Sequence, residues 1–235
     1  MNVYHITYAP EIKTASLYFD GCNFNCLGCI RKKTMYDVHL KARSGSKSGF
    51  LSLNEVLKIL NRIGARTVIM MGGEPTIDPE LPTLVEKLRK SGISSVLLTN
   101  GYELEDKLLE SVDRICVSIK AWSDELHRKF TGKSNKNTLK NFRKIYDSGV
   151  SLYSESIYIP SLVEVREIGK IARFISSVDP EIPYRIDAYI PVNGLWRAPT
   201  SKEVKEAVKE AKKHLRRVTC LYGDEKLKYE VLNVI

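Results

Sequence analysis

Three of the five cysteines lie close together, in the order Cys22-Asn-Phe-Asn-Cys26-Leu-Gly-Cys29. Thiolates at this spacing in a short loop can converge on one metal centre without a long excursion of the backbone. Three protein ligands leave one iron of a 4Fe–4S cluster open, which a substrate-coordinating cluster requires. A structural zinc site normally has four protein ligands in a closed shell. His5 or a distant cysteine would have to supply the fourth, because the chain has no second CxxC pair. We therefore favour an iron–sulfur cluster and keep zinc as the alternative.

Other residues with useful chemistry follow the short apolar runs that we predict to be strands. In βα folds, functional residues collect at the carboxyl ends of the strands. The residues that this rule selects are Gly72, Gly73, Glu74, Thr99, Asn100, Lys120 and Tyr189. The three cysteines follow the first predicted strand, so all of these residues are expected at one rim of the sheet.

The elements that must position these residues alternate regularly along the chain. Strands are predicted over residues 15–20, 67–71, 95–99, 114–120, 152–159 and 184–190. Helices are predicted over residues 53–63, 81–91, 104–111, 136–147, 163–176 and 201–215. This alternation predicts βαβ units and a parallel sheet. The fold class is therefore α/β, as a partial (βα)6 TIM-like barrel with parallel strands. We expect one domain over residues 1–235, with a core at about 15–215, an extension at 216–235 and a polar loop at 42–49.

The two-residue period of the strands predicts which side chains face the interior of the barrel. Ile115, Val117 and Ile119 share an apolar face that would pack against helices. The inward-facing residues would be Cys116, Ser118 and Lys120 in one strand, Glu155 and Ile157 in the next, and Arg185, Asp187 and Tyr189 in the last. Arg185 and Asp187 are candidates for contact with a cofactor or substrate. A structural ion pair between the two is the alternative.

Composition limits the class of protein and its partners. The chain has 235 residues, of which 43% are hydrophobic and 28% charged, and its formal net charge is +9. The basic residues are dispersed and many lie in predicted helices, so nucleic-acid binding is possible but unsupported. No apolar stretch approaches the ~18 residues of a membrane span, and no signal peptide is visible. We expect a cytoplasmic protein.

The motifs together resemble one enzyme superfamily. CxxxCxxC after a first strand resembles the signature of the radical S-adenosylmethionine (SAM) superfamily. Gly72-Gly73-Glu74-Pro75-Thr76 resembles its GGEP segment, which holds the amino group of SAM. The run from Val117 to Asn135 resembles the corresponding segment of pyruvate formate-lyase activating enzymes, as do the segments 157–160 and 189–192. The similarity extends from about residue 15 to residue 215.

The resemblance implies a reaction and a set of roles. Cys22, Cys26 and Cys29 would hold a 4Fe–4S cluster whose open iron binds SAM, and Lys120 would be a further catalytic residue. The implied cofactor-binding residues are Gly72, Gly73, Glu74, Thr99, Asn100, Ser118, Lys120, Glu155, Ile157 and Tyr189. Reductive cleavage of SAM would give a 5′-deoxyadenosyl radical that abstracts hydrogen from a glycine of a partner glycyl radical enzyme. Flavodoxin or ferredoxin would be the electron donor.

Several residues depart from the family pattern. The family has an aromatic residue at the position of Gly28 and a histidine at that of Tyr189. The activating enzymes have acidic residues at the positions of Leu98 and Ser118, and their arginine is replaced by Glu155. These departures leave open a radical SAM enzyme that acts on a small molecule or another peptide. A zinc-binding or nucleic-acid-binding module is the third hypothesis.

Overall fold

The protein is built around a curved sheet. The structure is a computed structural model that describes residues 1–37, 40, 49–192, 194–223, 225–226 and 229–235. Its nine strands are ordered β8-β7-β6-β5-β4-β3-β2-β1-β9. They are β1 (Val3–Ala9), β2 (Thr14–Phe19), β3 (Thr67–Gly72), β4 (Ser94–Thr99), β5 (Arg114–Ser118), β6 (Ser151–Tyr158), β7 (Tyr184–Ala188), β8 (Val218–Leu221) and β9 (Leu232–Asn233). Neighbours from β2 to β8 pair in parallel, whereas β1 pairs antiparallel with both β2 and β9.

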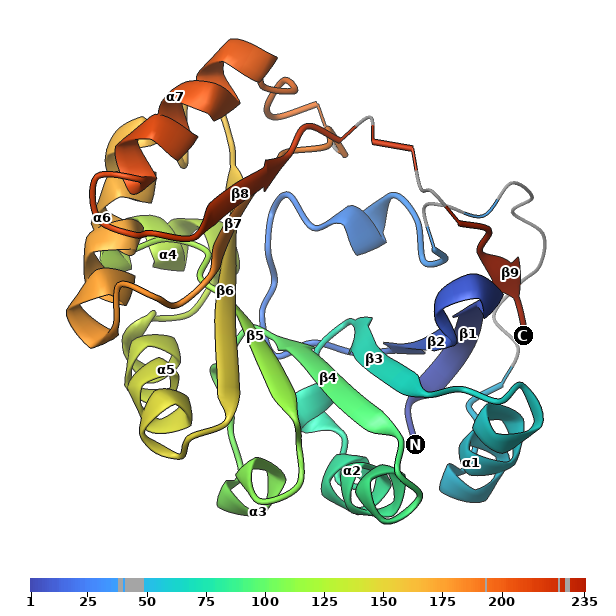
Figure 1. Cartoon of the computed structure of the whole chain (residues 1–235). Helices are drawn as coiled ribbons and strands as arrows, with labels where there is room; N and C mark the ends of the chain where they lie inside the picture. The colour runs from blue at the N-terminus through green and yellow to red at the C-terminus, as the bar shows by residue number, and fades with distance from the viewer. Residues whose placement is uncertain (38–39, 41–48, 193, 224, 227–228) are drawn as a thin grey trace.

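Helices cover the outer face of the sheet (Figure 1). They are α1 (Leu53–Arg62), α2 (Leu81–Lys90), α3 (Asp106–Leu109), α4 (Asp124–Thr131), α5 (Lys136–Asp147), α6 (Val165–Val178) and α7 (Ser201–Ala211). Helix α1 begins where Ser52 and Glu55 form a reciprocal capping box, and Thr200 and Glu203 do the same for α7. A cap of this kind stabilises a helix start by about 1 kcal/mol. The segment that follows β2 lies in the hollow of the sheet (Figure 1).

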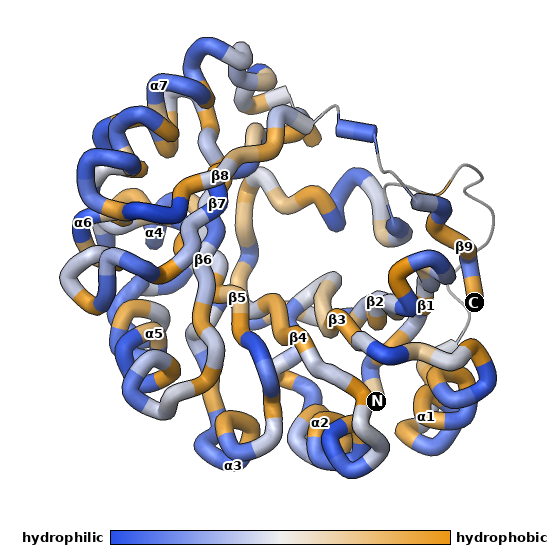
Figure 2. The backbone as a smooth tube through the Cα atoms, viewed as in Figure 1, coloured by the Kyte–Doolittle hydropathy of each residue, from blue (hydrophilic) through white to orange (hydrophobic). Residues whose placement is uncertain are grey.

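The two faces of the sheet differ in character, as the strand period predicted. Ile115, Val117 and Ile119 belong to the hydrophobic core beneath the helices. Ser118 instead bonds to Glu155 of the neighbouring strand on the inner face. In Figure 2 the tube is largely apolar along β3 and β4 and hydrophilic along much of α7. The core therefore lies between the sheet and its helices, and the inner face is left for polar side chains.

The six predicted strands are all present, and the α/β class with a partial barrel of parallel strands is confirmed. The sheet has additional strands, because β8 adds a further parallel strand and β1 and β9 add antiparallel ones. Strand β1 was missed because its first five residues are all buried, so the sequence shows no alternation of polar and apolar residues. The predicted loop at 42–49 lies outside the described residues except for Gly49.

Two helix predictions need correction. The helix expected over residues 104–111 is only Asp106–Leu109. Helix α4 was not predicted, because it is short and only three of its residues are buried. None of the described helices is both long and apolar enough to cross a membrane.

Candidate active site

The cysteine loop (residues 22–29) follows β2 and docks onto the C-terminal end of α4. The N–H of Asn25 donates to the carbonyl of Thr131 at 2.9 Å, and the N–H of Leu27 donates to that of Phe130 at 3.0 Å. The last carbonyls of a helix have no partner within the helix itself. The loop supplies these partners, so the cysteines are positioned by a helix end and not by loop sequence alone.

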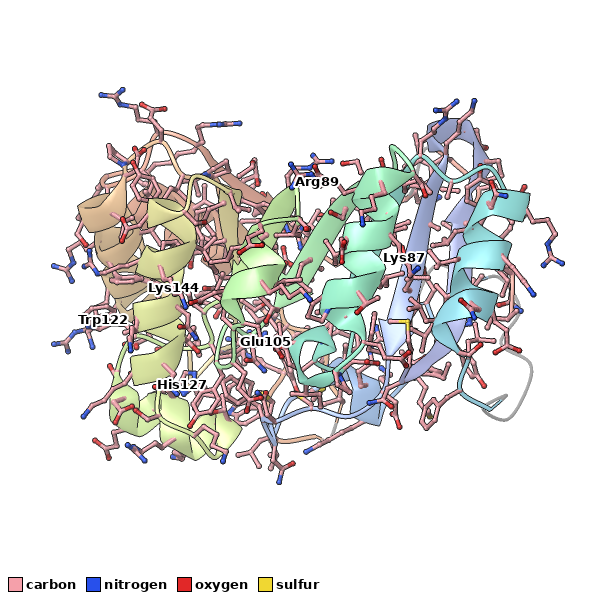
Figure 3. The ribbon with its side chains drawn as sticks, turned by 90° about the horizontal axis from the view of Figure 1, so that it is seen from below. Lys87, Arg89, Glu105, Trp122, His127 and Lys144 are labelled. Carbon is pink, nitrogen blue, oxygen red and sulfur yellow. The ribbon has the colours of Figure 1, made fainter. Side chains whose placement is uncertain are left out.

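One buried side chain of the loop reinforces this docking. The ring of Phe24 meets Tyr102 edge-on at 5.4 Å and His127 edge-on at 5.3 Å between ring centroids. His127 Nδ1 lies 2.7 Å from the carbonyl oxygen of Lys133, and since a carbonyl only accepts, Nδ1 carries the proton. Figure 3 shows His127 at the opposite end of the molecule from Arg89 at the C-terminal end of α2. Because α4 was not predicted, sequence reasoning missed these contacts.

The glycines after β3 allow two backbone segments to touch. Gly73 N–H donates to the carbonyl of Phe19 at 2.7 Å, and Glu74 N–H donates to that of Gly21 at 2.8 Å. A Cβ atom at Gly73 would lie 2.0 Å from the Gly21 carbonyl oxygen, and Gly72 has a φ of +109°. Only glycine fits such positions. The resemblance implied that Gly72 and Gly73 bind the cofactor; the close approach seen here is to the backbone that leads into the cysteine loop.

Glu74 is the centre of a buried hydrogen-bond network and is only 2% exposed. Its Oε1 accepts from the Thr99 hydroxyl at 2.6 Å and the Thr76 hydroxyl at 2.8 Å, and its Oε2 accepts from Asn100 N–H at 2.7 Å. Burial raises the pKa of Glu74, and the hydrogen bonds from Asn100, Thr99 and Thr76 oppose this shift. Thr99 and Asn100, predicted as cofactor contacts, hold Glu74 in this structure.

Asn100 also connects this network to the cysteine loop. Its Oδ1 accepts from Tyr102 N–H at 2.8 Å, which fixes the orientation of the amide. Its Nδ2 donates to Asn23 Oδ1 at 2.7 Å and lies 3.8 Å from Cys22 Sγ. Asn23 Nδ2 is buried and has no hydrogen-bond partner within the described residues. Asn23 was not among the predicted site residues, although its place next to Cys22 was a signal.

The three thiols and one ammonium group influence one another. All five cysteines of the chain are free. Burial raises the pKa of the Cys26 thiol to about 11, Lys120 lowers it, and Cys29 and Cys22 raise it again. The Lys120 ammonium forms neither a hydrogen bond nor an ion pair in the described part of the chain. The structure thus brings three thiols and one uncommitted cation together.

The donor set of the three thiols distinguishes between a zinc ion and an iron–sulfur cluster. Across the described ranges, no three His, Cys, Asp or Glu side chains are grouped closely enough to surround a single metal ion. In a 4Fe–4S cluster each thiolate binds a different iron atom, so the three thiols lie further apart than the ligands of a single metal ion do. Three thiols with no fourth ligand among the residues that the structure describes, beside the unpartnered amide donor of Asn23, fit such a cluster better than a four-ligand zinc ion.

The remaining predicted residues form the inner wall, which we define as Ser118, Glu155, Arg185 and Asp187 on β5, β6 and β7. Ser118 Oγ donates to Glu155 Oε1 at 2.6 Å, and Arg185 Nη2 donates to Glu155 Oε2 at 2.6 Å. Arg185 Nε donates to Asp187 Oδ1 at 2.7 Å, so the ion pair considered from sequence is present. Burial raises the pKa of Asp187, and Arg185 opposes this shift. Ile157 is half-buried further along the same strand face.

Tyr189 lies apart from the inner wall, beneath the cysteine loop. It is 2% exposed, and its ring contacts the backbone at Gly28. The predicted residues therefore divide into three groups. The cysteines, Gly72–Glu74, Thr99, Asn100 and Lys120 come together; Ser118, Glu155 and Ile157 face the hollow; and the ring of Tyr189 lies next to Gly28.

Comparison with known proteins identifies relatives across most of the chain. The sequence profile of the Radical SAM superfamily matches residues 16–175. A Methanocaldococcus jannaschii protein named as a glycyl-radical enzyme activating enzyme is 31% identical over 229 residues, covering 94% of this chain and 84% of that protein. A Staphylococcus epidermidis protein named as pyruvate formate-lyase-activating enzyme is 26% identical, covering 74% of this chain and 73% of that one. A Methanococcus maripaludis protein named as a GTP 3′,8-cyclase is 25% identical, covering 79% of this chain and 66% of that one.

Solved structures share the fold at low sequence identity. Methylornithine synthase superposes with a TM-score of 0.60 at 16% identity, covering 94% of this chain and 75% of that one. A domain of pyruvate-formate lyase-activating enzyme from Bacteroides vulgatus gives a TM-score of 0.57 at 20% identity, covering 65% of this chain and 97% of that domain.

Proposed function

This chain belongs to the radical SAM superfamily, and we propose that it activates a glycyl radical enzyme by abstracting hydrogen from a glycine of that partner. As a radical SAM enzyme it uses a 4Fe–4S cluster and SAM. The observation that carries the proposal is the alignment with the M. jannaschii protein, which covers 94% of this chain and 84% of that protein. A match of this extent compares almost the whole of one chain with the other, not only a shared core.

We assign roles to the site residues within this proposal. Cys22, Cys26 and Cys29 hold the cluster. The backbone at Gly72 and Gly73 accepts from the SAM ammonium, while buried Glu74 fixes that backbone by joining β3 to the end of β4. Lys120 supplies the positive partner for the SAM carboxylate or ribose, because its ammonium is uncommitted in the described residues.

Held by Cys22, Cys26 and Cys29, a reduced cluster would supply one electron for the cleavage of SAM into methionine and a 5′-deoxyadenosyl radical, and that radical would take a hydrogen atom from the substrate. Site residues must orient SAM and exclude competing hydrogen donors during this step. The inner wall suits the orienting part of this task, because hydrogen bonds from Ser118 and Arg185 to Glu155 and Asp187 hold its side chains in place.

The shape of the sheet supports a macromolecular substrate. Strand β8 and strand β9 are the two edges of the sheet and are not hydrogen-bonded to each other. The sheet is therefore not closed into a full barrel. We infer that an extended peptide loop carrying the target glycine reaches the inner face of this incomplete barrel.

A second candidate is a radical SAM enzyme that acts on a small molecule or another peptide. The half-buried charges of the inner wall favour it, because Glu155, Arg185 and Asp187 form a fixed polar surface. The M. maripaludis relative, whose name describes action on a nucleotide, is a further reason to keep it.

The deciding experiment uses a candidate partner glycyl radical enzyme, labelled with α-deuterated glycine. The reconstituted protein is reduced with dithionite under anaerobic conditions and mixed with SAM and this partner. We expect a glycyl radical signal in the electron paramagnetic resonance (EPR) spectrum and deuterium in the 5′-deoxyadenosine. Unlabelled 5′-deoxyadenosine without a partner radical would contradict the activase proposal and favour the second candidate. Cys26→Ala is the control, and it should yield neither product.

A further inference from the structure

We propose that Tyr189 is a positioning residue, whose ring packs against Gly28 and thereby fixes the position of the cysteine loop on the sheet. The inference rests on the proposed function, because Gly28 stands between two of the proposed cluster ligands, Cys26 and Cys29. It gives a specific role to Tyr189, which directly follows β7 and lies far from the cysteine loop in the sequence. It also gives a reason for a glycine at position 28.

Gly28 is not required by its backbone conformation. Its φ lies outside the left-handed region, which contains several other glycines of this chain. A Cβ atom at Gly28 would lie 2.9 Å from Tyr189 Cε2, 3.3 Å from Phe130 Cε2 and 3.4 Å from the Tyr189 hydroxyl oxygen. Carbon atoms in contact prefer a separation of about 3.5–4.0 Å. The absence of a side chain at position 28 therefore makes room for an aromatic ring.

The ring of Tyr189 has little freedom to move away. Its backbone N–H donates to the carbonyl of Tyr158 at 3.1 Å, which extends the pairing of β7 with β6. Its ring meets Trp196 edge-on at 6.0 Å, and Trp196 meets Phe130 edge-on at 6.0 Å. Aromatic pairs of this geometry contribute about 0.5–1.5 kcal/mol beyond their buried area. The ring is thus a fixed surface against which the loop rests.

The cysteine loop is held between this ring and α4. Leu27 N–H donates to the carbonyl of Phe130 at 3.0 Å, and Lys33 Nζ donates to the carbonyl of Pro191 at 3.2 Å. A shift of Gly28 would move Cys26 and Cys29 together, because the N–H of Cys29 donates to the carbonyl of Cys26 at 3.4 Å. Tyr189 therefore acts on the cluster through the position of two of its ligands.

The ring and not the hydroxyl carries this role. The Tyr189 hydroxyl accepts a long hydrogen bond of 3.4 Å from Val192 N–H. Tyr189→Phe keeps the ring and should match the unaltered protein in iron content and in the EPR spectrum of the reduced cluster. Tyr189→Leu removes the flat ring while keeping an apolar side chain, and it should broaden that spectrum and speed iron release.

The test is a double-mutant cycle of Gly28→Ala and Tyr189→Leu on the reconstituted holoenzyme. The readouts are the rate of iron release to a chelator and the EPR spectrum of the reduced cluster with and without SAM. Gly28→Ala alone should raise the rate of iron release. The fold-increase that Gly28→Ala causes should be about tenfold smaller when Tyr189→Leu is also present. A difference of this size lies within the range of coupling for residues in contact. Gly49→Ala is the matched control, because no atom lies within 4 Å of a Cβ atom built there.

Two outcomes would overturn the proposal. If Gly28→Ala behaves like Gly49→Ala, the loop does not rest on the ring and the proposal is wrong. If Gly28→Ala has the same effect with and without the Tyr189 ring, the clash lies elsewhere and the proposal also fails. Thermal unfolding of the apo-proteins identifies any variant that does not fold. Because the readouts need no substrate, they stay valid if activase function fails, and iron retention by Cys26→Ala would separately refute the ligand assignment.

Discussion

The cysteine–Glu74 region (residues 22–29, 72–74, 99 and 100) and the inner wall lie on the same sheet but are built differently. In the first, backbone meets backbone, and the 2% exposed Glu74 is enclosed by hydrogen-bond donors. In the second, side chains on regular strands pair with one another, and those of Glu155, Asp187 and Arg185 remain 15%, 22% and 36% exposed. A substitution in the first region must displace main chain, whereas one in the inner wall alters only the surface presented to the hollow. We infer that the first region serves SAM chemistry and the second distinguishes substrates.

The sharpest difference between the regions should come from Cys26→Ala. Loss of one of three thiolates should abolish cluster assembly and SAM cleavage together, measured as bound iron and 5′-deoxyadenosine. Cys220→Ala is the matched control, because Cys220 is a free, partly buried cysteine of β8. Retained SAM cleavage in Cys26→Ala would break the assignment of the first region.

Glu74→Gln should have the next largest effect. The amide presents a donor where the carboxylate accepted from Asn100, Thr99 and Thr76, so at least one buried group loses its partner. We expect a loss of about 1–3 kcal/mol in the free energy of unfolding and a matching loss of SAM cleavage. Unchanged denaturant midpoints would show that Glu74 does not hold the region together.

Lys120→Ala tests the border between the two regions. Loss of the uncommitted ammonium should raise the SAM concentration needed for half-maximal cleavage by roughly 10-fold or more, as expected for a hydrogen bond to a charged group. Bound iron should stay unchanged. Lys136→Ala, an exposed lysine at the start of α5, is the control. Equal SAM dependence in both variants would remove Lys120 from the site.

Arg185→Gln tests the inner wall. Glu155 and Asp187 lose their shared cation, so the wall becomes more acidic and its shape less fixed. We expect turnover of the substrate to fall more than SAM cleavage without substrate. The ratio of substrate turnover to SAM cleavage without substrate is measured as the ratio of labelled to unlabelled 5′-deoxyadenosine. A proportional fall in both would place Arg185 with the SAM chemistry and weaken the contrast between the regions.

Lowering the pH should have the smallest effect, a modest loss of stability of the apo-protein. Burial lowers the pKa of His127, whose ring supports the cysteine loop through Phe24. At acid pH the native state then binds fewer protons than the unfolded state. The contribution of neutral His127 to the free energy of unfolding is therefore complete above 6.5, the pKa of histidine in the unfolded chain. It is lost as the pH falls through the lower pKa of His127 in the native state. The midpoint of thermal unfolding of the apo-protein should fall between about pH 7 and pH 5 by a few degrees. His127→Phe should flatten this slope, to which His5, whose pKa burial also lowers, contributes with the same sign.

The sequence predicted those parts of the site that depend on local spacing. The cysteine motif, the glycines after β3 and the parallel strands all follow from patterns within a few residues. The arrangement of Glu74 could not be predicted, because two of its donors, Thr99 and Asn100, come from the end of a different strand. The contact of Gly28 with Tyr189 joins distant segments, and neither residue alone indicates it. Helix α4 was not predicted, because so short and polar a helix is stabilised by tertiary contacts and lacks a clear periodic pattern in the sequence.

The docking of the cysteine loop on α4 has a consequence for synthesis of the chain. Asn25 and Leu27 depend on carbonyls of Thr131 and Phe130, about one hundred residues later in the sequence. At ribosomal elongation rates of about 5–20 residues per second, the loop waits roughly 5–20 s for its support. During that interval the three thiols are exposed to oxidants in the nascent chain. Iron insertion should therefore follow translation of α4, and oxygen encountered before that point would damage the ligands before any cluster exists.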